Sequence, residues 1–119
     1  MLRWTCKSLT LTGLGRPMHK SAIMFYTIKE AIRAGLRLKL LLPDGERIVE
    51  PHVLGRDRRG KTLLRAYQVS GPNDGGAPWK VFDLDTIEHA VENGGRFDHP
   101  RPGYRPNDRS MTGGIIERL

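Results

Sequence analysis

The stretch that decides the fold runs from residue 36 to residue 69 and reads LRLKLLLPDGERIVEPHVLGRDRRGKTLLRAYQV. It contains three extended segments separated by two polar turns, Pro43-Asp44-Gly45 and Arg56-Asp57-Arg58-Arg59-Gly60. Proline presets φ and glycine accepts a positive φ, so the first turn has the residues that a hairpin needs. The second turn is a charged hairpin tip. We therefore expect two consecutive antiparallel hairpins.

The three extended segments differ in their patterns. Leucines and cations alternate strictly over residues 36–40, so the leucines share one face of a strand. Residues 47–54 are rich in β-branched side chains, and Pro51 among them indicates an edge position or a bulge. Residues 61–70 are the longest strand candidate and carry apolar groups on both faces. That last pattern favours a tightly curved sheet in which each face is partly covered.

A short helix is expected before the first strand. Thr27-Ile28-Lys29-Glu30 fits a capping box, in which the threonine hydroxyl and the glutamate carboxylate each accept from the other residue's backbone amide. Ile28, Ala31 and Ile32 then fall on one face, and Gly35 is a natural helix terminator. These features predict a helix of about two turns that lies on the sheet.

The rest of the chain is expected to close the same small sheet. Residues 71–78 read as a flexible loop, residues 79–82 as a short strand, and residues 83–87 as a tight turn into a final strand or helical turn. Phe97 and Tyr104 are expected to pin an irregular segment to the body of the domain. Closure into a barrel removes exposed sheet edges. The sequence therefore predicts a mainly β fold: a small, strongly bent antiparallel barrel with one short N-terminal helix.

Length and charge set the domain organisation. The 119 residues suffice for one domain. Of the net charge of +7, the first 29 residues carry +5 and contain no acid. We expect a disordered basic tail over residues 1–20, the domain over 21–110 and a C-terminal tail over 111–119. The basic tail is also compatible with contact to nucleic acid or an anionic surface, or with an organelle transit peptide.

The cysteine content and the hydropathy indicate a cytoplasmic chain. A single cysteine, Cys6, allows no disulfide within the chain. No apolar run approaches the ~20 residues that a membrane-spanning helix needs.

The order of motifs resembles that of the WYL domain, a bacterial sensor module, over about residues 27–97. The motifs that carry the resemblance are Arg47-Ile48-Val49-Glu50-Pro51, Ala66-Tyr67 and Phe82-Asp83-Leu84-Asp85-Thr86-Ile87. The resemblance implies an SH3-like (Sm-like) barrel that binds a nucleotide, an oligonucleotide or single-stranded nucleic acid and has a regulatory role. The chain departs from the family pattern in two places. Thr62-Leu63-Leu64 stands where the family has the Trp-Tyr-Leu triplet that gives it its name, and Thr86 stands where the family has an arginine. The resemblance would therefore make the chain a divergent, stand-alone member.

The resemblance also implies a set of ligand contacts. Arginine suits phosphate, and tyrosine can stack on a base. The candidates by family position are Arg47, Arg65, Tyr67 and Lys80, with His52 and Gln68 as additional base or ribose contacts. At the hairpin tip, Arg56, Arg58 and Arg59 are candidates for contact with a nucleic-acid backbone. The alternative is that all these polar ends lie in water while their stems pack on the barrel.

No pattern in the sequence points to catalysis. His52, His89 and His99 lack the spacing of metal ligands, and Asp83 with Asp85 fits a turn better than an acid–base pair. We expect a binding module with no cofactor, metal site or enzymatic activity. The alternative is a protein-interaction or oligomerisation module with the same barrel and no nucleic-acid ligand, which the departures from the family pattern favour.

Overall fold

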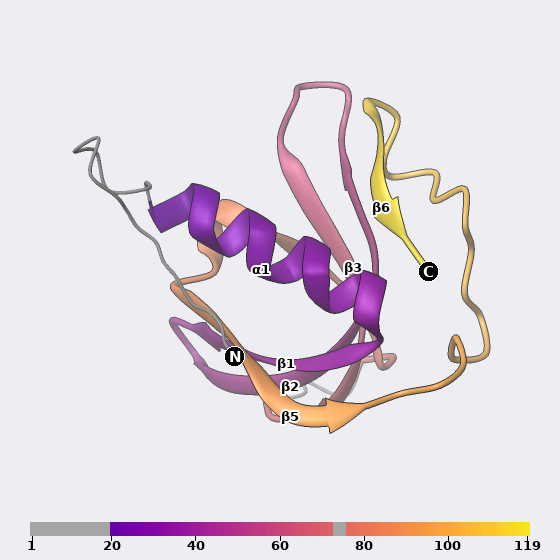
Figure 1. Ribbon diagram of the computed structural model, residues 1–119. Helices are drawn as coiled ribbons and strands as arrows, with labels where there is room; N and C mark the ends of the chain where they lie inside the picture. Colours follow the sequence, from indigo (N-terminus) through magenta and orange to yellow (C-terminus); the bar gives the residue numbers. More distant parts are fainter. Residues whose placement is uncertain (1–19, 73–75) are drawn as a thin grey trace, which may run out of the picture.

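The computed structural model describes residues 20–72 and 76–119 of the chain. In this part of the chain, one α-helix and a bent antiparallel sheet account for most of the structure (Figure 1). The elements in order are α1 (Lys20–Ala34), β1 (Leu36–Leu42), β2 (Gly45–Arg56), β3 (Thr62–Ser70), β4 (Trp79–Asp83), the 3₁₀ turn η1 (Leu84–Thr86), β5 (His89–Arg96) and β6 (Gly114–Arg118). The expectation of a mainly β, barrel-like domain with one leading helix is confirmed.

Strand β2 is the centre of the sheet. The strand order is β4-β3-β2-β1-β5, and β6 also pairs with β2. Along one edge of β2, strand β3 pairs with it over most of its length. Along the other edge of β2, β1 pairs with its first half and β6 with its last residues. Strand β1 pairs as far as Val49, and β6 begins its pairing at Val53. Residues 50–52 therefore lie in a gap between these two partners.

The gap explains the proline in the middle of a long strand. Pro51 has no N–H to donate, and it lies in the part of β2 that neither β1 nor β6 covers. The register of β2 against β3 also shifts between Pro51 and Val53. The expected edge position or bulge at Pro51 is thus confirmed, and the bulge lies next to the polar cluster described below.

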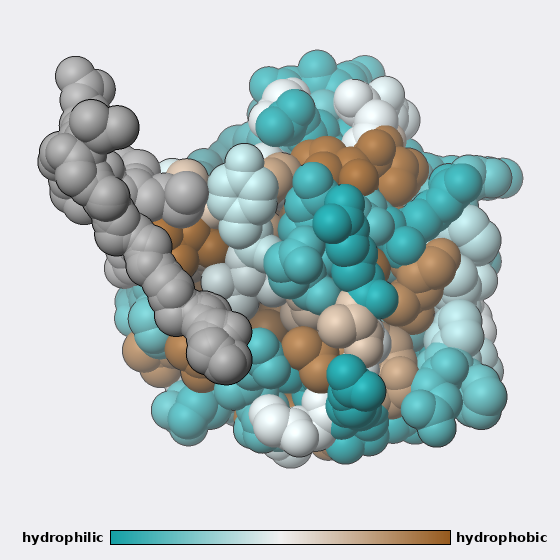
Figure 2. Space-filling view, viewed as in Figure 1, coloured by the Kyte–Doolittle hydropathy of each residue, from teal (hydrophilic) through white to brown (hydrophobic). Residues whose placement is uncertain are grey.

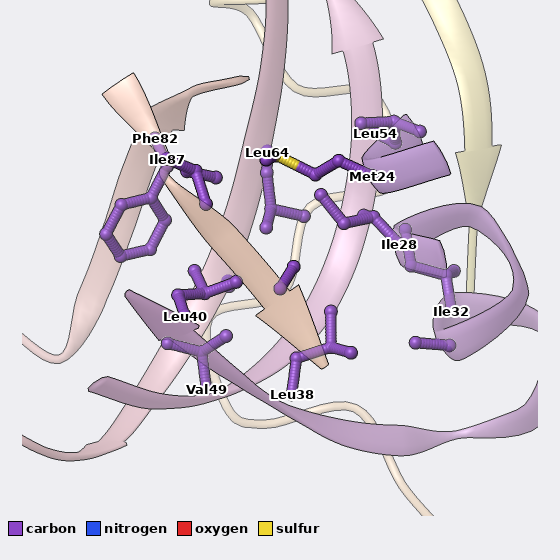
Figure 3. Close-up of a cluster of buried hydrophobic side chains, with 13 residues drawn as sticks. Met24, Ile28, Ile32, Leu38, Leu40, Val49, Leu54, Leu64, Phe82 and Ile87 are labelled. Carbon is purple, nitrogen blue, oxygen red and sulfur yellow. The ribbon is translucent and has the colours of Figure 1, made fainter. Parts of the chain in front are cut away.

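The inner face of the bent sheet forms the hydrophobic core with α1. Figure 3 shows Met24, Ile28 and Ile32 of the helix pointing toward the side chains of the sheet. The side chains of the sheet and of the turn between β4 and β5 that complete this core are Leu38, Leu40, Val49, Leu54, Leu64, Ala66, Phe82, Ile87 and Ala90.

The helix is longer than the capping box predicts. It begins at Lys20, so Thr27 lies within it, and the Thr27 hydroxyl donates to the carbonyl of Ile23 at 2.9 Å. The buried stripe extends back to Met24, and burial of that stripe outweighs the local capping signal. The end of the helix is as expected, because Gly35 has a φ of 68°.

The C-terminal residues are part of the sheet, which corrects their assignment to a tail over residues 111–119. Strand β6 pairs with β2 antiparallel, with Val53 opposite Arg118 and Arg56 opposite Gly114. Strand β5 runs through Asn93-Gly94-Gly95 and ends at Arg96, and the irregular segment expected around Phe97 and Tyr104 follows it. The predicted basic tail of residues 1–20 lies, except for Lys20, outside the described residues.

Within the described ranges, no helix has the length and apolar character needed to cross a bilayer.

The helix–sheet packing gives a direct test of the fold. Ile28 is 0% exposed, and Ile28→Ala is expected to lower the free energy of unfolding by about 2–4 kcal/mol because it leaves a cavity. Ile23 lies on the same helix but is 51% exposed, so Ile23→Ala is expected to change it by less than about 0.5 kcal/mol. Urea denaturation measures both. Equal losses would contradict the described orientation of α1.

Candidate functional site

The segment between β5 and β6 runs along one side of the molecule, from the end of β5 to the start of β6 (Figure 1). The indole Nε1 of Trp79 donates to the carbonyl of Pro102 at 2.8 Å, and the hydroxyl of Tyr104 donates to the carbonyl of Leu119 at 2.9 Å. The rings of Phe97 and Tyr104 lie 5.3 and 5.5 Å from the ring of His52. The two aromatic residues therefore hold this segment against the sheet, as expected.

Glu50 is the polar centre of the outer face of the sheet. Its side chain is 0% exposed and accepts hydrogen bonds from two guanidinium groups. Arg101 donates through Nε to Oε1 at 2.6 Å and through Nη2 to Oε2 at 3.0 Å, while Arg37 donates through Nε to Oε2 at 2.8 Å. Burial raises the pKa of Glu50, but the hydrogen bonds and charges of the two arginines outweigh it, so the net pKa lies below the ordinary value. Glu50 is therefore an ionised carboxylate that is hydrogen-bonded to two arginine side chains.

His52 lies beside Glu50 and is also 0% exposed. Its Nδ1 lies 2.7 Å from the carbonyl of Glu50, and its Nε2 accepts from the backbone N–H of Arg101 at 3.1 Å. Burial lowers the pKa of His52, in keeping with a neutral ring that carries its proton on Nδ1. Both ring nitrogens are thus engaged within the protein. This placement corrects the expectation that His52 contacts a ligand, because the ring has no exposed surface.

A cleft of about 400 Å³ lies over this cluster, and three arginines line it: Arg37, Arg96 and Arg101. The Glu50 carboxylate accepts hydrogen bonds from the Nε atom of Arg37 and from Nε and Nη2 of Arg101. Among the residues that the structure describes, Nη1 and Nη2 of Arg37, Nη1 of Arg101 and the whole side chain of Arg96 make no hydrogen bond or ion pair. The residues that line the cleft thus include three arginines with N–H groups still available, and Phe97 and Asp98 are also in its lining.

A second cleft, of about 590 Å³, lies on the other side of residues 97–100, between the end of α1 and β6. Unlike the cleft over Glu50, which has Arg96, it has no arginine whose side chain lacks a hydrogen bond or ion pair to a described residue. Arg33 pairs with Glu30 and Glu117 at 3.3 and 3.2 Å, and Arg118 donates to the side chain of Asn107 at 3.2 Å. The arginine-lined cleft over Glu50 is therefore the better candidate for an anionic ligand.

The sequence-predicted contacts do not form one site, because β3 divides them between its two faces. Gln68 is opposite Val49 on the inner face, whereas Tyr67 is opposite Glu50 on the outer face. Arg47 is tied to the inner group, donating to Gln68 at 3.2 Å and to Asp44 at 2.6 Å. Tyr67 instead belongs to the outer cluster, where the guanidinium of Arg101 lies 4.7 Å from its ring centre and the Trp79 ring 5.5 Å away.

The remaining predicted contacts are Arg65, Lys80 and the three arginines of the hairpin tip. Arg65 forms a two-pronged ion pair with Asp108, at 2.7 and 3.3 Å. Lys80 is on β4 opposite Ala66. At the hairpin tip, Arg56, Arg58 and Arg59 are exposed, and their side chains make no ion pair with any described residue.

Sequence reasoning missed the cleft for identifiable reasons. Arg96 and Arg101 lie at or beyond the end of β5, where the sequence has no periodic pattern. One signal was present: Glu50 is an acid that directly follows the apolar pair Ile48-Val49 and precedes Pro51, and a charge that such a strand buries needs a partner.

Neither a known family model nor a curated protein matches the sequence significantly. A solved structure that the chain resembles is proteasome accessory factor B/C (PafBC) of Arthrobacter aurescens, with a TM-score of 0.53 and 28% sequence identity. The match covers 69% of this chain and only 13% of that chain. PafBC contains a WYL domain, and at this identity and coverage the likeness gives only weak support to the WYL-like fold that the motifs predict.

In the described part of the chain, no group of three or more His, Cys, Asp or Glu side chains is placed to hold a metal ion.

The ion pair between Arg65 and Asp108 predicts an acid-dependent loss of stability. Burial raises the pKa of Asp108, but hydrogen bonds from Arg65 and Ser110 lower it from 3.8 to about 2. Because the folded-state pKa is depressed, the pair stabilises the fold above pH 3.8 and loses that contribution as the pH falls toward 2. Asp108→Asn is expected to cost about 2 kcal/mol at neutral pH.

Urea denaturation of wild type and Asp108→Asn over this pH range measures the effect. The difference in unfolding free energy between the two is expected to shrink toward pH 2. A difference that stays constant with pH would show that the carboxylate charge is not what stabilises this contact.

Proposed function

We propose that the chain is a non-enzymatic regulatory module that binds a phosphate-bearing ligand, a nucleotide or single-stranded nucleic acid, in the arginine-lined cleft over Glu50. The observation that carries this proposal is that Arg37, Arg96 and Arg101 line one cleft, and that each keeps guanidinium N–H groups that make no hydrogen bond or ion pair with a described residue. Guanidinium groups present paired donors that match the oxygens of a phosphate.

The local charge of the cleft also suits an anion. Three guanidinium groups line it, against the carboxylates of Glu50 and Asp98. Two of the three are held in place by a buried carboxylate, so little side-chain freedom remains to be lost when a ligand binds. Phe97 in the lining offers an apolar ring against which a base could pack.

The exposed arginines at the hairpin tip, Arg56, Arg58 and Arg59, would add nonspecific attraction to a longer nucleic acid. The contacts predicted at Arg47, Arg65, Tyr67, Gln68 and Lys80 remain a prediction of the family resemblance. Arg47 and Arg65 are already paired with acids, at 2.6 and 2.7 Å, so a ligand would have to compete with Asp44 and Asp108 for them.

A protein-interaction role is the alternative, and one observation bears on it. Ile23 and Tyr26 are both 51% exposed, one helical turn apart on α1. On the face that Figure 2 shows, hydrophobic residues are interspersed with hydrophilic ones rather than gathered into one broad patch. This surface pattern favours the anion-binding role over a large apolar interface.

The test is a fluorescence-anisotropy titration of the full chain with a short labelled single-stranded oligonucleotide at two salt concentrations. We expect binding that weakens with salt, and competition by a nucleoside 5′-monophosphate. Arg96→Ala is expected to weaken binding roughly 3- to 10-fold, because it removes donors that no protein group uses.

Arg105→Ala is the matched control, since Arg105 is exposed, makes no ion pair with a described residue and lies outside the cleft lining. It removes the same charge and is expected to change the affinity little. Equal losses in both variants would indicate nonspecific attraction to a basic chain. Loss in Arg58→Ala alone would place the site at the hairpin tip, and no binding at all would favour a protein partner.

A further inference from the structure

The two arginines over Glu50 share an unusual arrangement. Each donates its Nε to the same buried carboxylate, Arg37 at 2.8 Å and Arg101 at 2.6 Å. The Nε atom is the guanidinium donor nearest the side-chain stem, so fixing it fixes the plane of the whole group while both Nη atoms of Arg37 and Nη1 of Arg101 remain available.

We infer that Glu50 is a positioning residue for ligand binding, holding the Nη donors of Arg37 and Arg101 toward the cleft without touching the ligand itself. This inference rests on the proposed function and adds the residue that sets the geometry of its site. Glu50 is 0% exposed, so it cannot meet a ligand, and its effect on binding passes through the two arginines.

Glu50 has two opposed effects on an anionic ligand. Its negative charge lowers the positive potential of the cleft, which weakens attraction for an anion. Its hydrogen bonds preorganise the donors, which strengthens binding. A variant that removes only the charge of Glu50 therefore separates the two effects. It binds an anion more tightly if the charge effect is larger, and more weakly if the preorganisation effect is larger.

Gly95 offers a second test that changes no charge. A Cβ atom at Gly95 would lie 3.1 Å from Nη1 and 3.4 Å from Cδ of Arg37, so Gly95→Ala would push the Arg37 guanidinium aside by a few tenths of an ångström. The atoms it meets belong to a flexible side chain, and the backbone at Gly95 has no positive φ, so the fold should accommodate the methyl group. Asn93→Ala, a change of an exposed residue on the same strand, is the matched control.

The experiment measures the affinity of the full-length chain and its variants for the labelled single-stranded oligonucleotide, with thermal unfolding of each variant recorded in parallel. Glu50→Gln keeps the shape of the side chain but removes its charge. We expect it to weaken binding on the order of tenfold although the cleft becomes more positive. Gly95→Ala is expected to weaken binding a few-fold with an unchanged salt dependence and a melting temperature near that of Asn93→Ala.

A folded Glu50→Gln variant that binds as tightly as wild type, or more tightly, would overturn the inference, since charge would then outweigh positioning. Gly95→Ala with wild-type affinity would overturn it as well, and it decides the question alone if Glu50→Gln does not fold. If Arg96→Ala weakens oligonucleotide binding but neither Glu50→Gln nor Gly95→Ala does, the positioning role is contradicted and the proposed function still holds. A wild-type chain that does not bind the oligonucleotide would overturn both.

Discussion

A single buried carboxylate organises the outer face of this domain. Glu50 is fully enclosed, and an ionised group in that position is tolerated only when it is paired and hydrogen-bonded. The pairing groups, Arg37 and Arg101, come from β1 and from the segment after β5, so the carboxylate links three parts of the chain. The backbone of Arg101 also bonds His52 and its guanidinium covers the Tyr67 ring. Glu50 is therefore one of the contacts that hold the segment between β5 and β6 on the sheet, together with those of Trp79 and Tyr104.

The backbone of β2 explains why the cluster forms at this place. Neither β1 nor β6 pairs with residues 50 and 51, although the carbonyl of His52 accepts from the backbone N–H of Leu119, just after β6, at 3.0 Å; the proline with its bulge also removes a donor there. The segment that includes Phe97, Arg101 and Tyr104 covers the outer face beside this gap with side-chain contacts. The same irregularity that interrupts the ladder thus provides both the enclosure for Glu50 and the cleft above it.

Local patterns predicted most of the sheet, and non-local contacts account for what they missed. The two hairpins, the alternation over residues 36–40 and the bulge at Pro51 are confirmed because each depends on near neighbours in sequence. Strand β6 has only five residues, and its partner β2 is far away in sequence, so nothing local marks it. The helix start was misplaced because burial of Met24 outweighs the capping signal at Thr27.

The candidate site was less predictable than the fold, since it depends on which face each side chain occupies. The resemblance pointed to β2, β3 and β4, yet the register places Gln68 and Tyr67 on opposite faces. The most direct test of the account is a ¹H–¹⁵N spectrum of the arginine side chains, recorded with and without a nucleoside 5′-monophosphate. It should show shifts at Arg37, Arg96 and Arg101 with the Nε signals of Arg37 and Arg101 protected from exchange. Shifts confined to Arg56, Arg58 and Arg59, or none at all, would contradict a binding cleft organised by Glu50.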